Sequence, residues 1–175
     1  MKRRLPTMAD RRQYRRVVYG RLIKEVVSTA FGSPGRIRVL DVGCGSGLVS
    51  RTFKRICSDA TVIGVDMASV EIKKARSNAC SAHLDIRYSL GDMASLPFGS
   101  ESFDAVLAGL VFFEMEPKDR AACLCELYRV LKRGGRLLLI EGTGMQDFAG
   151  QMRKAGFKES ARIETAANDI YDAVK

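Results

Sequence analysis

Three glycines spaced two residues apart stand at the end of an apolar run near residue 40. In the segment VLDVGCGSGL, Gly43, Gly45 and Gly47 separate a predicted strand from a predicted helix. A strand that turns directly into a helix presents backbone N–H groups and the positive end of the helix dipole. Glycines at such a turn allow a ligand to approach the main chain closely. The pattern therefore predicts a ligand site, with a tight turn that binds nothing as the structural alternative.

The residues around the turn select among the ligands that use such sites. Dinucleotide sites require a small residue at the last position of G-x-G-x-x-G, where this chain has Leu48. Phosphate loops for ATP require a lysine, which the turn lacks. Asp41 adds negative charge instead, so a ligand that carries its own positive charge and a small carboxylate fits better. S-adenosylmethionine has a sulfonium, an ammonium and one carboxylate; an NAD-dependent oxidoreductase is the weaker alternative.

Two aspartates follow the next two predicted strands. Asp66 ends the segment VIGVD, about 20 residues beyond Gly45, which is the separation at which an acidic residue accepts hydrogen bonds from ribose hydroxyls. Capping of the helix that follows is the structural alternative. Asp92, in the tripeptide GDM, follows the third predicted strand, and its carboxylate can accept a hydrogen bond from an adenine amino group. Taken alone, the Gly-Asp pair indicates only a turn.

The elements that must position these residues alternate between strands and helices. Short apolar runs predict strands, and apolar residues at helical spacing predict helices. Such alternation predicts one doubly wound α/β domain, in which helices cover both faces of a mainly parallel sheet to give three layers. The predicted strands cover residues 37–42, 61–65, 84–90, 103–108 and 136–140, with two weak strands near 163 and 170–174. The predicted helices cover residues 48–56, 70–79 and 145–155, and one runs from Pro117 to the pair Gly134-Gly135.

Four stretches, taken in order, resemble a known family. VLDVGCGSG, VIGVDMASVEIKKAR, GDMASLPFGSESFDAVLA and ELYRVLKRGGRLLLIEG are similar to the successive motifs of class I S-adenosylmethionine-dependent methyltransferases. The subgroup is methyltransferase type 11, or UbiE-like, whose third motif reads LPF…SFD. The resemblance, over about residues 36–142, implies a Rossmann-like methyltransferase fold whose seven-stranded sheet has its last strand antiparallel. It also implies an enzyme that transfers a methyl group from S-adenosylmethionine.

The resemblance implies roles for residues at the ends of four strands. The glycine turn with Asp41 and the backbone of Cys44 matches the motif around the methionine end of the cofactor. Asp66 matches the acidic residue that binds the ribose, and Asp92 matches a residue at the adenine edge. Residues 108–110 match the strand end that lies beneath the methionine portion. The implied cofactor-binding residues are Asp41, Gly43, Cys44, Gly45, Gly47, Asp66, Met67, Asp92, Met93, Ala108 and Leu110. No metal-binding residue is predicted.

The acceptor half of the site departs from the family pattern. Many relatives carry histidines after the fourth strand, where this chain reads LVFFEME, and a long insert after the fifth strand, which is missing here. The N-P-P-Y motif for amino acceptors and the Pro-Cys nucleophile for cytosine are also absent from the sequence. Small molecules, protein side chains and RNA remain as acceptors. A subunit that binds S-adenosylmethionine without catalysis and works with a partner, or with a second copy of the chain, is the other open interpretation.

No catalytic residue is assigned from the sequence. In-line displacement at a sulfonium depends mainly on alignment, and a general base is needed only where the nucleophile must lose a proton. Glu114, Glu116 and Glu141 lie near the carboxyl ends of predicted strands, but surface or capping roles are favoured for all three. The one histidine, His83, precedes the third predicted strand at the opposite edge of the sheet, and no role is predicted for it.

Positive charge is concentrated at the N-terminus. Residues 1–24 contain nine basic residues and one acidic residue, and the remainder holds 20 basic and 19 acidic residues out of totals of 29 and 20. We therefore divide the chain into a basic helical arm, residues 1–34, and a cofactor-binding domain, residues 35–175. The concentration of positive charge in the arm predicts that it associates with RNA or an acidic protein. The structural alternative is a helix face that is exposed to solvent and binds no partner. Its arginines at helical spacing are Arg11, Arg12, Arg15 and Arg16.

Composition sets the expected compartment. A chain of 175 residues fits one domain with a sizeable core. No apolar run reaches the length of a membrane span, and no apolar stretch follows the basic start as in a secretory signal. The five cysteines include no C-x-x-C pair, which favours reduced thiols used as small apolar residues. We expect a cytoplasmic protein without a membrane partner.

Overall fold

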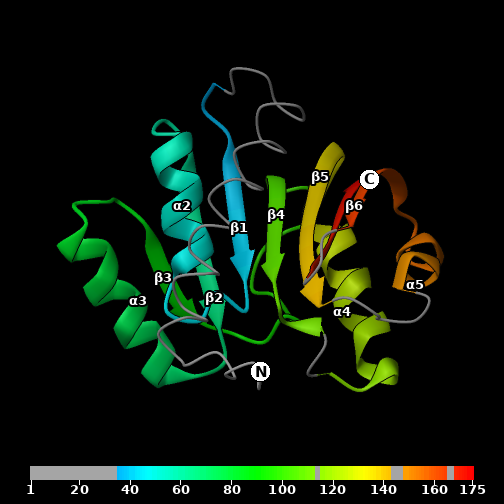
Figure 1. The fold of residues 1–175 in the computed structure, drawn as a ribbon, viewed down its shortest axis with the longest axis horizontal. Helices are drawn as coiled ribbons and strands as arrows, with labels where there is room; N and C mark the ends of the chain where they lie inside the picture. The colour runs from blue at the N-terminus through cyan, green and yellow to red at the C-terminus, as the bar shows by residue number, and fades with distance from the viewer. Residues whose placement is uncertain (1–34, 113–114, 143–147, 165–167) are drawn as a thin grey trace, which may run out of the picture.

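The computed structural model describes residues 35–112, 115–142, 148–164 and 168–175. The predicted arm and Glu114 lie outside these ranges. The described elements form a seven-stranded sheet with helices on both sides (Figure 1). The strands are β1 (Arg38–Val42), β2 (Thr61–Asp66), β3 (Arg87–Leu90), β4 (Phe103–Gly109), β5 (Leu131–Gly142), β6 (Lys158–Glu164) and β7 (Asn168–Val174). The helices are α2 (Leu48–Ile56), α3 (Ser69–Ser81), α4 (Pro117–Val130) and α5 (Phe148–Lys154).

The order of the strands creates the crevice in which a ligand site is expected. The sheet order is β3-β2-β1-β4-β5-β7-β6, with parallel pairing from β3 to β5. β7 runs antiparallel to both β5 and β6, which confirms the predicted antiparallel last strand. The chain winds to one side of β1 through β2 and β3 and to the other side through β4. In such sheets a ligand binds outside the carboxyl ends of the strands at the point where the winding reverses.

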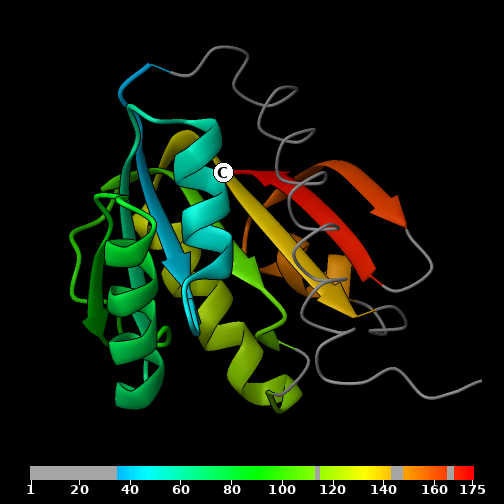
Figure 2. The same ribbon diagram turned by 60° about the vertical axis from the view of Figure 1, so that its left-hand side comes forward.

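Alternating apolar side chains bury both faces of the sheet. On one face, Val39 of β1 packs with Val49 and Phe53 of α2. On the other face, Leu40 packs with residues of α4 and α5, including Leu124. Seen from the side, α2 and α3 stand on one side of the sheet and α4 on the other (Figure 2). The three predicted layers are therefore confirmed.

The largest departures from the predicted bounds concern three elements. The strand predicted over 84–90 begins only at Arg87, because His83 takes a left-handed φ of 53° and the Leu84 N–H bonds back to the last turn of α3. The helix that starts at Pro117 ends at Val130 rather than at the glycine pair. The following strand is accordingly longer than the predicted 136–140: β5 pairs with β4 from Leu131 onward and with β7 as far as Gly142.

The described residues also show the state of the cysteines and the character of the helices. All five cysteines are free thiols, and Cys123 is buried while Cys125, two residues later, is exposed. The two side chains thus point to different sides of α4, as their spacing predicts. Among the described helices, none combines the length and the apolar character needed to cross a bilayer.

Candidate functional site

The glycine turn joins β1 to α2 at the carboxyl edge of the sheet. Gly43, Gly45 and Gly47 have φ values of 58°, 49° and 76°, a region that residues with a side chain rarely adopt. The N–H of Gly47 donates to the Cys44 carbonyl at 2.8 Å, and the N–H of Cys44 donates to Val65 of β2 at 3.1 Å. The N–H of Gly45 is used as well, because it donates to the carboxylate of Asp66. The sequence predicted that the turn offers unpaired N–H groups to a ligand. That expectation is wrong for Cys44, Gly45 and Gly47.

What the turn offers a ligand is space at one glycine. A Cβ on Gly43 would lie 2.5 Å from the Val111 Cγ2, and a Cβ on Gly47 would lie 2.4 Å from the hydroxyl oxygen of Tyr88. Among the described residues, a Cβ on Gly45 would meet nothing closer than a Glu71 carboxylate oxygen at 4.0 Å. Gly43 and Gly47 are thus required by the packing of the protein itself. Gly45 leaves an open backbone that a ligand can approach.

Asp66 links the end of β2 to this turn. Its Oδ2 accepts the hydrogen bond from Gly45 N at 2.8 Å, and its Oδ1 accepts one from Ala68 N at 2.9 Å. Each carboxylate oxygen has two lone-pair sites, so both can still accept from a pair of ligand hydroxyls. Met67, the next residue, is 78% exposed, which is unusual for a large apolar side chain. A carboxylate and an apolar surface therefore stand side by side at this strand end.

Asp92 continues the same edge at the end of β3. The N–H of Gly91 donates to the Asp66 carbonyl at 3.1 Å, which ties this strand end to that of β2. Asp92 is exposed, and its Oδ1 accepts a hydrogen bond from Ala94 N at 2.8 Å. Met93 is half-buried and packs against the core beneath. The fold thus brings the predicted residues of β1, β2 and β3 to one edge.

Asp41 lies below the turn rather than in the crevice. Its side chain is buried, and its Oδ2 accepts hydrogen bonds from both the backbone N–H and the hydroxyl of Ser50, in the first turn of α2. Burial raises the pKa of Asp41 to about 7, although the two hydrogen bonds from Ser50 act to lower it. The negative charge of Asp66 adds to the rise. In this conformation Asp41 holds the start of α2 and supports the turn. Sequence reasoning missed Ser50, although a serine next to the apolar Val49 at the start of an amphipathic helix is a usable signal.

The side chains of Cys44 and Tyr88 fill the space between the turn and α3. The Cys44 thiol is buried with Ile72, Ala75 and Tyr88, and burial raises its pKa far above the ordinary range. The thiol therefore stays neutral, and a role for the Cys44 backbone at a ligand remains a prediction. Burial also raises the pKa of Tyr88 to about 12, and its hydroxyl has no hydrogen-bond partner among the described residues.

The end of β4 is held in a strained conformation by Glu141. Leu110 has a φ of 56°, and its N–H donates to the Ile140 carbonyl at 2.7 Å. The Oε1 of Glu141 accepts hydrogen bonds from Val111 N and Phe112 N, each at 3.0 Å. Glu141 is fully buried, so it caps backbone groups as predicted but is not a surface carboxylate. The arrangement fixes the backbone that leaves β4 at the crevice.

The other candidates of the sequence are placed less centrally. Ala108 is buried in the core below the sheet edge, so only the backbone beyond it faces the crevice. Glu116 is exposed at the start of α4. His83 lies in the turn before β3, at the end of that strand away from Asp92. Within the described ranges, no group of three or more histidine, cysteine, aspartate or glutamate side chains could hold a metal ion.

Comparison with known proteins identifies a family with this arrangement. A family model described as a methyltransferase domain matches residues 40–139. A demethylmenaquinone methyltransferase of Thermus thermophilus is 36% identical over 104 residues, which are 59% of this chain and 46% of that protein. This chain thus spans less than half the length of that relative.

Solved structures share the fold at low sequence identity. A SAM-dependent methyltransferase from Aquifex aeolicus superposes with a TM-score of 0.74 at 20% identity, over 88% of this chain and 92% of the other. The [4+2]-cyclase SpnF superposes with a TM-score of 0.79 at 21% identity, over 89% of this chain and 80% of the other. These two similarities concern the fold, and they show that one fold is used by a methyltransferase and by a cyclase.

Proposed function

This chain belongs to the methyltransferase domain family, and from that premise we propose that it binds S-adenosylmethionine at the glycine turn and transfers the methyl group to a small molecule. The observation that carries the proposal is the open backbone at Gly45, hydrogen-bonded to Asp66 at the carboxyl edge of the sheet. A bare, left-handed backbone beside a carboxylate is what a nucleoside with an attached amino acid requires. The Leu48 position argues against a dinucleotide, because the close helix–strand packing of that site needs a small residue there.

The residues present fit the cofactor in a consistent order along the edge. Gly45 would allow the methionine portion to approach the backbone closely. Asp66 would accept hydrogen bonds from the ribose hydroxyls. The exposed Met67 would pack against the purine, and Asp92 would accept from its amino group. Asp41 would act from below by holding the start of α2.

When bound, S-adenosylmethionine supplies an electrophilic methyl group on a sulfonium. The task of the chain is then to align an acceptor with that group and to keep water away. The strained backbone after β4, held by Glu141, is the described segment best placed for alignment, because it borders the crevice beside the glycine turn. We assign no general base, since the buried carboxylates of Asp41 and Glu141 are both engaged with backbone N–H groups.

We further propose that the acceptor is an apolar small molecule of the demethylmenaquinone kind. The relatives named for that substrate support this choice. The described residues that follow β4 support it independently, because Leu110, Val111 and Met115 are half-buried apolar side chains. Apolar side chains at the end of β4 favour an apolar ring system over a charged acceptor.

A subunit that binds the cofactor without methyl transfer is the second candidate. It is favoured by the lack of an insert after β5 in the sequence. The two candidates make different predictions about turnover, although both require cofactor binding.

The test is transfer of a radiolabelled methyl group from S-adenosylmethionine to reduced demethylmenaquinone, to RNA or to no acceptor. We expect labelled quinone and stoichiometric S-adenosylhomocysteine. At limiting S-adenosylmethionine, Asp66→Asn should transfer much less methyl group than the unaltered chain, and Asp59→Asn, just before β2, should transfer as much. Labelled RNA in place of quinone would overturn the proposed acceptor. Tight binding of S-adenosylmethionine without any transfer would overturn the proposed activity in favour of the binding subunit.

A further inference from the structure

The segment that carries Asp92 is held by two side chains that lie outside the crevice. Residues 91–102 connect β3 to β4, and in the structure they form no helix or strand apart from a single bridge between Asp92 and Ser95. A segment without sheet or helix partners must find other partners for its backbone N–H and C=O groups. In this protein several of them are supplied by α4.

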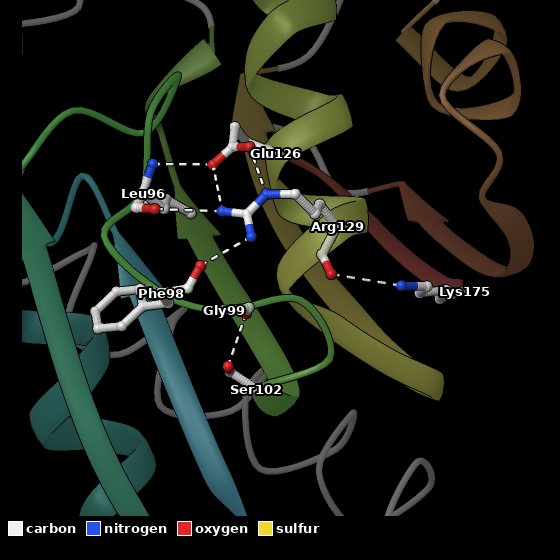
Figure 3. Close-up of polar contacts among 7 residues, drawn as sticks. All are labelled: Leu96, Phe98, Gly99, Ser102, Glu126, Arg129 and Lys175. Atoms are coloured by element: carbon white, nitrogen blue, oxygen red, sulfur yellow. Dashed lines mark hydrogen bonds and ion pairs between the residues drawn. The ribbon is translucent and has the colours of Figure 1, made fainter.

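Arg129 and Glu126 of α4 bond directly to the backbone of this segment (Figure 3). The Nη1 of Arg129 donates to the Phe98 carbonyl at 2.8 Å, and its Nη2 donates to the Leu96 carbonyl at 3.2 Å. The Oε2 of Glu126 accepts from the Leu96 N–H at 2.9 Å. Leu96 is thus held on both its N–H and its C=O by a pair of charged groups.

The two side chains also orient each other. Arg129 Nε donates to Glu126 Oε1 at 2.7 Å and Arg129 Nη2 donates to Oε2 at 2.8 Å, a bidentate pair between residues three positions apart on one helix. The hydrogen bond from Arg129 lowers the pKa of Glu126, so the carboxylate stays ionised. Hydrogen bonds to ionised groups are roughly twice as strong as neutral ones. The pair is therefore a fixed, charged support for Leu96.

The support reaches Asp92 through a short, closed turn. The Ser95 N–H donates to the Asp92 carbonyl at 3.1 Å, and the Ala94 N–H donates to the Asp92 side chain at 2.8 Å. Leu96, whose side chain is buried, follows this turn directly. Leu96 is thus joined to Asp92, at the carboxyl end of β3, by one closed turn.

We propose that Glu126 and Arg129 are positioning residues for the purine end of the cofactor, acting through Leu96 on the turn that presents Asp92. This inference rests on the proposed function, because it assigns the pair to the same cofactor site. The pair itself does not reach the ligand. It determines whether the Asp92 carboxylate stands where it can accept a hydrogen bond from the purine amino group.

A purely structural pair and a positioning pair differ in what they do to ligand selectivity. A structural pair would change stability, or would change affinity for every ligand alike. A positioning pair for Asp92 changes the preference between S-adenosylhomocysteine, which has the amino group, and S-inosylhomocysteine, which has a carbonyl oxygen in its place. Calorimetric titration of the full chain with both compounds measures this preference.

The variants are Arg129→Gln and Arg129→Lys, with Arg133→Gln as the matched control. Arg133 lies close by, and its 92% exposed side chain pairs only loosely with Glu101 at 3.6 Å. We expect Arg129→Gln to weaken S-adenosylhomocysteine binding roughly tenfold and to leave S-inosylhomocysteine nearly unchanged, an effect that Asp92→Asn reproduces. Arg129→Lys should restore only part of the preference, because an ammonium cannot reproduce the fork of the guanidinium. Arg133→Gln should bind as the unaltered chain does.

Equal weakening of both ligands in Arg129→Gln, or no weakening of either, would overturn the inference while leaving the proposed function intact. Failure of the unaltered chain to bind either compound would overturn the proposed function and this inference together. If Arg129→Gln does not fold, Glu126→Gln is the milder variant, because its amide oxygen can still accept from Leu96. We expect it to shift the preference in the same direction, and an unchanged preference there would count against the pair.

Discussion

Gly45→Ala tests whether the open side of the glycine turn is where the cofactor approaches. Among the described residues, the nearest neighbour of the added methyl group is the Glu71 carboxylate oxygen at 4.0 Å, so none of them is crowded. The cost to the fold is then mainly the left-handed backbone, about 1–2 kcal/mol for an alanine, reduced by the smaller entropy of the unfolded chain. A net loss of about 1 kcal/mol corresponds to a fall in Tm of roughly 2–4 °C for a domain of this size.

Gly134→Ala is the matched control for that strain. Gly134 lies near the start of β5 with a φ of 72°, and among the described residues nothing lies within 4 Å of its added Cβ. Both variants should therefore lose the same stability in chemical denaturation. Only Gly45→Ala should lose affinity for S-adenosylhomocysteine, by roughly 5- to 150-fold, because overpacking by one methyl group costs about 1–3 kcal/mol.

Gly43→Ala and Gly47→Ala complete the comparison. Their added carbon atoms would lie 2.5 Å from Val111 and 2.4 Å from Tyr88, so both should be less stable than Gly45→Ala by about 1–3 kcal/mol. Titration calorimetry and denaturant unfolding of the four variants check the whole pattern. Unaltered affinity in Gly45→Ala, or an equal loss of affinity in Gly134→Ala, would refute the reasoning.

Three further predictions follow from the same site and from the arm. Asp66→Asn should weaken S-adenosylhomocysteine binding roughly 10- to 150-fold, because hydrogen bonds to a charged acceptor are lost, whereas Asp59→Asn should bind normally in calorimetry; equal affinities would contradict the ribose role. Burial raises the pKa of Asp41 to about 7, so between about pH 4 and 7 the folded chain keeps a proton that the unfolded chain releases. The free energy of unfolding should fall as the pH rises through that range, by up to about 1.4 kcal/mol per unit, and Asp41→Asn should flatten the slope in denaturant titrations; an identical slope would remove Asp41 as its source. If the arm binds RNA through three or four phosphates, log affinity should fall against log salt with a slope of about −2 to −3, and glutamine at the four arm arginines should flatten that slope while leaving cofactor affinity intact; a flat response in the unaltered chain would contradict the role of the arm.

The sequence determined the features that depend on neighbouring residues. The spacing of apolar residues predicted the alternation of strands and helices, and that alternation predicted a parallel sheet. Such spacing can be recognised because it involves residues that are close along the chain. The glycine spacing predicted a turn between β1 and α2, and the separation from Gly45 predicted an acidic residue at the end of β2; the left-handed glycines and the Gly45–Asp66 hydrogen bond came from the structure. Such features follow from local backbone geometry and from the regular length of one strand–helix–strand unit.

Tertiary structure alone decided what each of these residues does. Gly43, Gly45 and Gly47 look equivalent in sequence, yet Val111 from beyond β4 closes the space at Gly43 and Tyr88 from β3 closes it at Gly47. Glu141 was one of three equivalent carboxylates until the fold placed it on backbone groups 29 and 30 residues away. Arg129 reaches Phe98 across 31 residues in the same way. The partner of a long polar side chain depends on which distant segments the sheet places beside it. The order of the strands in the sheet cannot be deduced from the local pattern of residues along the chain.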